Sequence, residues 1–106
     1  MSDAIVVTTT LAHKEEALSL GKLLLKKRLI GCAQVSSPVH SLYWWKGEIE
    51  QSEEYCLVMK SSASLWEMLE EEIRLNHPYD VPEILATPVA AVSKEYEQWL
   101  LEELRK

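Results

Sequence analysis

The side chains best suited to hold a metal ion lie close together in the second half of the chain. His77 supplies an imidazole, which is the commonest side-chain ligand for copper and zinc at neutral pH. Asp80 and Glu83 follow it in a loop that Pro78 and Pro82 stiffen. The two carboxylates could close around a cation together with the imidazole. One hypothesis is therefore a divalent-cation site built from these three side chains.

Each of these side chains also has a structural interpretation. His77 stands where a predicted helix ends, and a partly charged imidazole interacts favourably with the last carbonyl groups of a helix. Asp80 and Glu83 could instead accept hydrogen bonds from backbone N–H groups and fix the path of the loop. Because one histidine does not make a metal site, the structural role is the favoured interpretation.

The two cysteines, Cys32 and Cys56, show no spacing typical of a zinc site or a redox motif. The thiol of Cys32 is a soft donor suited to Cu(I), but small apolar neighbours favour a packed side chain over a metal ligand. His13 and His40 are dispersed in the sequence and are interpreted as surface or cap residues. We interpret both cysteines as reduced core thiols.

The sequence carries none of the common catalytic motifs. It has no glycine-rich phosphate loop, no serine in a nucleophile elbow and no His-Glu pair at metalloprotease spacing. A nucleophile–base pair of Cys32 and His77 can be imagined, but the sequence gives no distance between them. We therefore expect a protein that is not an enzyme.

Hydrophobic periodicity indicates the elements that must position these residues. Ser64 and Glu67 match the capping-box pattern at the start of a helix, and Lys46-Gly47 offers a tight turn between two strands. Alternation predicts strands over residues 4–10, 32–35, 39–45, 49–59 and 84–91, and helical spacing predicts helices over residues 13–28 and 64–76 and a terminal helix with Tyr96, Trp99, Leu100 and Leu104.

With residues 32–35 and 39–45 counted as one strand that has a bulge or edge position at Pro38, the predicted order is β-α-β-β-α-β followed by a short helix. This is the order of the ferredoxin-like split βαβ fold, an α+β architecture with both main helices on one face of an antiparallel sheet. A long hairpin joins the second and third strands. The length of 106 residues fits a single domain spanning residues 1–106.

Charge and composition narrow the range of partners. The chain has 11 Lys and Arg against 17 Asp and Glu, a net charge of −6, which argues against a nucleic-acid partner. No run approaches the roughly 18 apolar residues of a membrane span. The acidic start at Ser2-Asp3 does not resemble a secretory signal, so we expect a cytoplasmic protein without a membrane partner.

The predicted hairpin is too long for a chain of this size. Arms of about 14 residues at about 3.3 Å each span about 46 Å, whereas a domain of this length has a radius of gyration near 13 Å. Its far end carries Tyr43, Trp44 and Trp45, which the core of the same chain cannot cover. Because exposed aromatic residues are typical of interfaces, we infer a homo-oligomer.

Residues 41–50 (SLYWWKGEIE), Lys60 and residues 77–84 (HPYDVPEI) together resemble the CutA divalent-ion tolerance family. The resemblance covers nearly the whole chain. It implies a ferredoxin-like protomer, a tight homotrimer joined by the long hairpin, and a link to tolerance of copper and other divalent ions. Some members have a thiol near the end of the first strand, where this chain has Thr8-Thr9-Thr10. A copper site of that kind would lack a soft ligand here.

Four further residues are candidates for an inter-subunit cleft or contact. Lys60 lies at the end of the hairpin, Tyr79 belongs to the loop after His77, and Tyr96 and Trp99 share the terminal helix. These aromatic side chains could line a cleft between subunits or simply fill the subunit contact, and packing is the favoured role.

Two functions follow from this combination. In the first, a homotrimer binds or buffers divalent ions, with copper as the expected cofactor, through His77 with carboxylates or Cys32. In the second, the protein is a trimeric signalling or scaffold module that resembles PII-type nitrogen-regulatory proteins and binds a small ligand between subunits. The abundance of glutamate after residue 46 disfavours an anionic ligand in that half of the chain.

Overall fold

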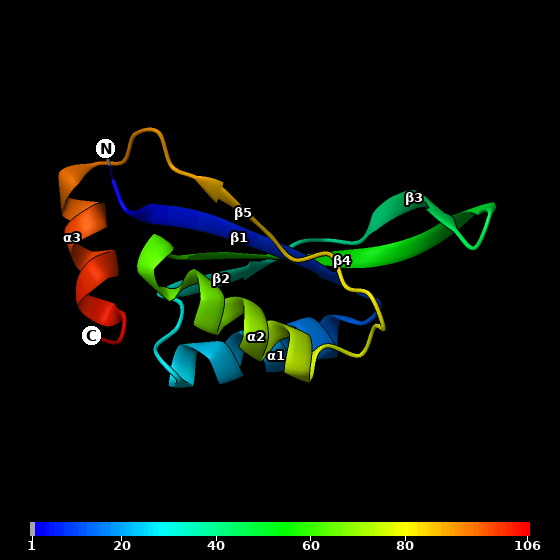
Figure 1. Cartoon of the computed structure of the whole chain (residues 1–106), viewed down its shortest axis with the longest axis horizontal. Coiled ribbons are helices and arrows are strands. Elements are labelled where there is room, and N and C mark those ends of the chain that lie inside the picture. Colours follow the sequence, from blue (N-terminus) through cyan, green and yellow to red (C-terminus); the bar gives the residue numbers. More distant parts are fainter. Residues whose placement is uncertain (1) are drawn as a thin grey trace.

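A five-stranded antiparallel sheet with two helices packed on one face forms the body of the molecule (Figure 1). The computed structural model describes residues 2–106. The strands lie in the order β2-β4-β1-β5, and β3 pairs with the distal half of β4. This is the predicted α+β ferredoxin-like fold. Its elements are β1 (Ala4–Leu11), α1 (Lys14–Lys26), β2 (Cys32–Val35), β3 (Val39–Trp45), β4 (Glu48–Ser62), a 3₁₀ turn (Ala63–Leu65), α2 (Trp66–Asn76), β5 (Leu85–Pro88) and α3 (Lys94–Glu103).

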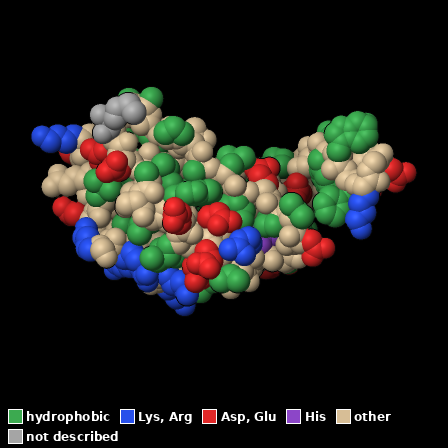
Figure 2. All heavy atoms as spheres, viewed as in Figure 1, with side chains coloured by type: hydrophobic (Ala, Val, Ile, Leu, Met, Phe, Trp, Pro, Cys, Tyr) green, Lys and Arg blue, Asp and Glu red, His purple; other side chains and the backbone are tan. Residues whose placement is uncertain are grey.

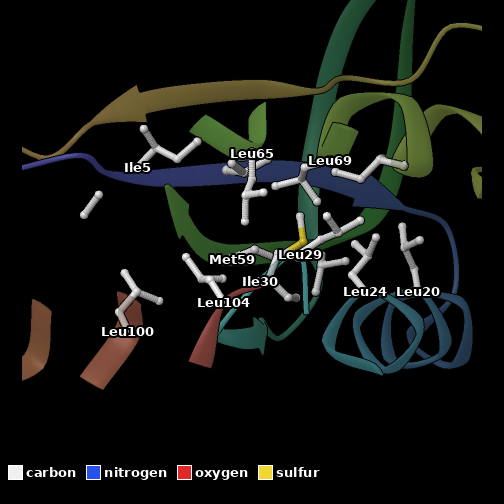
Figure 3. Packing of buried hydrophobic residues seen from close by; sticks show 14 of the residues in the cluster. Ile5, Leu20, Leu24, Leu29, Ile30, Met59, Leu65, Leu69, Leu100 and Leu104 are labelled. Atoms are coloured by element: carbon white, nitrogen blue, oxygen red, sulfur yellow. The ribbon is translucent and has the colours of Figure 1, made fainter. Parts of the chain in front are cut away.

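Strand alternation places the core between the sheet and the helices. On the central strands, Val7 lies opposite Met59, and the side chains of both are fully buried. The helical stripe of α1 contributes Leu20 and Leu24, which extend toward the sheet in Figure 3, and Ile73 of α2 joins the same cluster. Burial of these apolar side chains is the main force that holds the two helices on this face.

Neither α1 nor α2 covers the opposite face of the sheet, and α3 reaches it only at one end, where Tyr96 contacts Cys32; we call the remainder the helix-free face. The residues that point there alternate with the core residues: Val6 and Thr8 on β1, Val58 and Lys60 on β4, and Leu85 on β5. All of these side chains remain partly or largely accessible. A ferredoxin-like sheet in this chain therefore leaves one side available for contact with another molecule.

The distal halves of β3 and β4 form an arm that projects beyond the body (Figure 1). The longest dimension of the molecule is 44 Å, against 26 and 24 Å for the others. Lys46 and Gly47 at the tip have φ angles of 50° and 82°, as a tight two-residue hairpin turn requires. The expected turn and the expected overhang are both present.

The two sides of the hairpin are not equally continuous, which corrects the expectation of two equal arms. β4 runs without interruption for 15 residues, whereas the opposite side is divided into β2 and β3. Between them Ser36 stays attached to β4, because its backbone N–H donates to the Cys56 carbonyl and its hydroxyl accepts from the Cys56 N–H. Pro38 follows and lacks an N–H for the ladder, which explains the break.

Two predicted boundaries are wrong. The capping box does not form: residues 63–65 make a 3₁₀ turn, and the Ser64 hydroxyl lies 2.9 Å from that of Ser62 instead of capping a helix. The helix α2 therefore begins at Trp66. The last strand is also shorter than predicted, because β5 pairs with β1 only over Leu85–Pro88.

The terminal helix closes one end of the core. Leu100 of α3 and Leu104, which directly follows the helix, are buried, and Figure 3 shows both reaching the core. The Arg28 guanidinium binds the Glu103 carboxylate at 2.7 Å, and the Arg105 backbone N–H donates to the Arg28 carbonyl. Apolar burial and these polar contacts together fix the position of α3.

Thr9 offers a test of the core. Its side chain is fully buried, and its hydroxyl has no hydrogen-bond partner within residues 2–106. Because an unpaired buried hydroxyl is destabilising, Thr9→Val should raise the free energy of unfolding by about 1 kcal/mol. Urea unfolding at fixed protein concentration measures this change. Thr8→Val, on the helix-free face, is the matched control, and a lower stability for Thr9→Val would contradict the assignment.

Candidate functional site

A hollow in the surface lies between the arm and the loop that follows α2. It is a cleft of about 870 Å³, with residues 41–45 of the arm and residues 79–83 of the loop as its walls. Thr10, Glu50 and Glu54 complete the lining. Figure 2 shows acidic side chains on the surface where the arm leaves the body. We refer to this feature as the arm cleft.

His77 anchors the loop to the body from behind this cleft. Its side chain is only 8% exposed. Nδ1 accepts a hydrogen bond of 3.1 Å from the Tyr79 backbone N–H, so the ring proton must lie on Nε2, which donates to the Thr10 carbonyl at 2.9 Å. Both ring nitrogens are thus engaged, and the imidazole has no lone pair left for a cation.

The environment of His77 favours its neutral form. Burial lowers the pKa of the imidazole, and this effect exceeds the opposing influence of the Thr10 hydrogen bond and of the Glu16 and Glu54 charges. A neutral ring is also what the hydrogen bonds require, because a protonated Nδ1 could not accept from Tyr79. The prediction that a partly charged His77 interacts with the end of the helix is therefore wrong in its charge. The predicted position is correct, because His77 directly follows the last residue of α2.

Tyr79 connects the loop to the arm. Its hydroxyl donates a 2.8 Å hydrogen bond to Oε2 of Glu54, a carboxylate that is only 6% exposed. Its ring lies 4.8 Å from the His77 ring, centroid to centroid. Burial and the Glu54 hydrogen bond raise the pKa of the Tyr79 phenol far above its usual value. The tyrosine is therefore a firm donor to Glu54 at any physiological pH.

The four predicted metal ligands are not brought together in one protomer. Asp80 and Glu83 line the arm cleft, but the nitrogens of His77 are engaged elsewhere. Cys32 pairs with Lys60, six residues along β4 from Glu54, and so lies near the other end of the sheet. Within residues 2–106, no three His, Cys, Asp or Glu side chains are grouped closely enough to hold a metal ion.

A second cluster surrounds Cys32. Its Sγ lies 3.5 Å from the Tyr96 hydroxyl, and this contact, with burial, raises the pKa of Tyr96 to about 12. The Tyr96 and Trp99 rings are 5.5 Å apart. Lys60 donates to the side chain of Gln34, next to this cluster. Lys60, Tyr96 and Trp99 therefore belong with Cys32, while Tyr79 belongs to the arm cleft.

The aromatic residues of the arm divide between its two faces. Trp44 lies opposite Ile49, and Leu42 is on the same side, two residues away. Tyr43 lies opposite Glu50, and its hydroxyl is 3.1 Å from that of Ser52. The side chain of Trp45, two residues further along β3, lies on the same face as that of Tyr43. One face of the arm is thus apolar, and the other combines aromatic rings with carboxylates.

Several residues of these surfaces are absent from the sequence prediction. Strand alternation could have identified Leu42 and Ile49 as part of the apolar face, because their side chains lie on the same face as that of Trp44. Strand alternation also places Glu50 and Glu54 on one face of β4, but it does not indicate that Glu54 is buried. That burial depends on the loop folding back onto β4, and no local pattern indicates such a contact.

Comparison with known proteins agrees with this architecture. The family model described as "CutA1 divalent ion tolerance protein" matches residues 5–103. The divalent-cation tolerance protein CutA of Pyrococcus horikoshii is 43% identical over 102 residues, which cover 96% of this chain and 99% of the relative.

Solved structures show the same fold. The crystal structure of CutA1 from Oryza sativa superimposes with a TM-score of 0.95 at 32% identity, covering 99% of this chain and 96% of the other. The periplasmic divalent cation tolerance protein CutA of Archaeoglobus fulgidus gives a TM-score of 0.92 at 29% identity, with 96% and 99% coverage. No helix within residues 2–106 is long and apolar enough to cross a membrane.

The neutral state of His77 makes stability depend on pH. Because its pKa is lower in the folded protein than the ordinary value of 6.5, the unfolded chain binds a proton first as the pH falls. Stability should therefore be fully present above about pH 6.5 and decrease as the pH falls toward the folded-state pKa, by at most about 1.4 kcal/mol per pH unit for one proton.

Urea unfolding between pH 7.5 and pH 5 tests this dependence. His77→Gln should be less stable at pH 7.5 and should show a smaller loss of stability between pH 6.5 and pH 5 than the parent protein. His13→Gln, which removes an exposed imidazole at the start of α1, is the control substitution. If the free energy of unfolding changed equally with pH in the parent protein and in His77→Gln, the assigned neutral tautomer of His77 would be contradicted.

Proposed function

Because the chain belongs to the CutA1 divalent ion tolerance family, we propose that it acts in divalent-cation tolerance as a homotrimer whose subunits are joined through the arm. The observation that carries this proposal is the apolar face of the arm. Leu42, Trp44 and Ile49 lie together there and are 67%, 72% and 65% exposed. Each protomer contributes one domain.

Such a surface is costly in water. Three large apolar side chains that share one face of a two-stranded ribbon form a contiguous patch, and patches of this kind are typical of protein contacts. The body of the same chain does not reach the arm to cover it, since the arm projects beyond it (Figure 1). The helix-free face of the sheet adds a second unpartnered surface. The number of three subunits follows from the family resemblance.

Direct binding of copper or another divalent cation is the finer part of the proposal. With both His77 nitrogens engaged, the remaining donors are Asp80 and Glu83 in the arm cleft and Cys32 near the end of the sheet, where its Sγ lies 3.5 Å from the Tyr96 hydroxyl. Assembly would bring a neighbour's donors to these positions and complete a coordination shell that a single protomer lacks. Carboxylate oxygens suit hard divalent ions, whereas a thiolate suits Cu(I).

We propose no catalytic activity for this chain, and the names of its relatives describe tolerance of divalent cations and not a reaction. The cytoplasm is the proposed compartment, because Cys32 and Cys56 are unpaired thiols. Relatives differ in this respect, since that of Archaeoglobus fulgidus is described as periplasmic and that of Oryza sativa as chloroplastic.

Assembly through the arm can be tested by substitution. Trp44→Ala combined with Ile49→Ala should weaken the trimer by about 2 kcal/mol or more per contact, because central aromatic anchors carry much of an interface energy. Light scattering coupled to gel filtration, over a range of protein concentrations, measures the dissociation. Leu75→Ala on α2 is the control, since Leu75 is also 67% exposed but lies on the body. A trimer that is unchanged in the double variant would rule out the arm as the main contact.

Direct metal binding can be tested by calorimetric titration of the metal-free trimer with Cu²⁺, and with Cu(I) under reducing conditions. We expect Asp80→Asn with Glu83→Gln to reduce Cu²⁺ affinity at least tenfold, and Cys32→Ser to affect Cu(I) more than Cu²⁺. His77→Gln should leave the Cu²⁺ affinity within about threefold, because its nitrogens are already engaged. A complete loss of binding in His77→Gln alone would show instead that the imidazole turns outward to coordinate the ion.

A further inference from the structure

The arm cleft contains a buried carboxylate that no cation within residues 2–106 neutralises. Glu54 is 6% exposed and lines the cleft. Its Oε2 accepts from Tyr79, while Oε1 accepts no hydrogen bond from any residue within 2–106. None of the salt bridges in this part of the chain reaches it. Because a buried charge is costly unless it is paired, this carboxylate is suited to a positively charged partner.

The remaining lining of the cleft has the same preference for positive charge. Glu50, Asp80 and Glu83 also border it, and no Lys or Arg of residues 2–106 does. Four carboxylates around one hollow, without a cation to balance them, attract cationic ligands and repel anionic ones. Nucleotides, phosphates and other carboxylates are therefore unsuited to this cleft.

Aromatic side chains form much of the wall. Tyr43 and Trp45 come from the polar face of the arm, and Tyr79 comes from the loop, where the His77 ring and the Glu54 hydrogen bond fix its position. The faces of such rings attract positive charge. The ammonium of Lys46 already lies 5.7 Å from the centroid of the Trp45 ring, which shows that this ring is accessible to a cation.

The combination distinguishes an organic cation from a bare metal ion. A divalent metal needs several nitrogen, oxygen or sulfur donors in contact with it, and no three suitable side chains are grouped for this within residues 2–106. An ammonium group that carries carbon substituents needs less: one carboxylate for its charge and aromatic faces for its apolar surface. The volume of about 870 Å³ is in the range of small-molecule sites.

We propose that the arm cleft binds a small organic ammonium compound, with its cationic group between the Glu54 carboxylate and the rings of Tyr43, Trp45 and Tyr79. This binding goes beyond cation tolerance. It depends on the proposed assembly only in requiring that neighbouring subunits leave the cleft open. The rings of Tyr43 and Trp45 come from the face of the arm opposite to Ile49, but Leu42 and Trp44 also line the cleft, so the oligomeric state is measured together with ligand binding.

The experiment compares choline with its neutral carbon isostere, 3,3-dimethyl-1-butanol, by calorimetry on the assembled protein, with tryptophan fluorescence as a second readout. Choline should bind with a Kd in the millimolar range or below and at least tenfold more tightly than the isostere. Equal affinities would show an apolar pocket without charge recognition and would overturn the proposal. Absence of choline binding to the intact trimer would overturn it as well, because the cleft would then be closed or unsuited.

Matched substitutions locate the site. Glu54→Gln and Trp45→Leu should each weaken choline binding at least tenfold. If Glu54→Gln impairs folding because Glu54 is buried, Glu50→Gln removes an exposed carboxylate of the same cleft instead. Glu53→Gln makes the same charge change on a neighbouring exposed residue, and Trp99→Leu removes an equally exposed tryptophan at the other end of the molecule. Both controls should leave the affinity unchanged. Choline binding that survives all three cleft substitutions would place it elsewhere and refute the proposal.

The same variants separate this proposal from cation tolerance. Trp45→Leu should leave Cu²⁺ binding and the trimer intact while it weakens choline binding, because a metal ion gains nothing from the ring face. A parent protein that assembles and binds Cu²⁺ but ignores choline would refute the organic-cation site alone. A parent protein that remains monomeric and still binds choline would refute the proposed assembly and support the site.

Discussion

The structure depends on one strand that is longer than the body to which it belongs. The proximal half of β4 pairs with β1 and β2 and buries Leu57 and Met59 in the core, and its distal half pairs only with β3. An isolated two-stranded ribbon is only marginally stable in water. The body holds the base of the arm rigid, and in the proposed trimer contacts with neighbouring subunits would cover its tip. Folding and the proposed assembly are then linked through this strand.

The cleft is a consequence of the same overhang together with one buried histidine. His77 binds the Thr10 carbonyl on β1 and the Tyr79 N–H in its own loop, and so holds the loop beneath the base of the arm. Tyr79 then reaches Glu54 on β4. A residue that resembles a metal ligand in the sequence thus acts through hydrogen bonds to shape the cleft.

The sequence predicted most of the fold, because alternation along the strands and helical spacing are local patterns that burial enforces. It located the Lys46-Gly47 turn and the overhanging hairpin for the same reason. It failed for Ser64, whose capping pattern lost to a 3₁₀ turn. The roles of His77 and Glu54 could not be predicted, because their burial and partners arise from contacts between segments 67 and 25 residues apart. Such contacts leave no periodic signal.

Strand geometry explains how one arm can serve two purposes. Successive side chains of a strand point to opposite faces, so Leu42, Trp44 and Ile49 gather on one side while Tyr43, Trp45 and Glu50 gather on the other. The apolar tip of the first face suits a second copy of the chain, although His40 and Glu53 lie on the same face nearer the body, and a face of rings and carboxylates suits a cation. The two sets of side chains could exchange faces only if the pairing register of the whole arm changed. The two-residue turn at Lys46-Gly47 fixes that register, so this short turn determines which side chains form the apolar tip proposed for assembly and which rings and carboxylates face Tyr79.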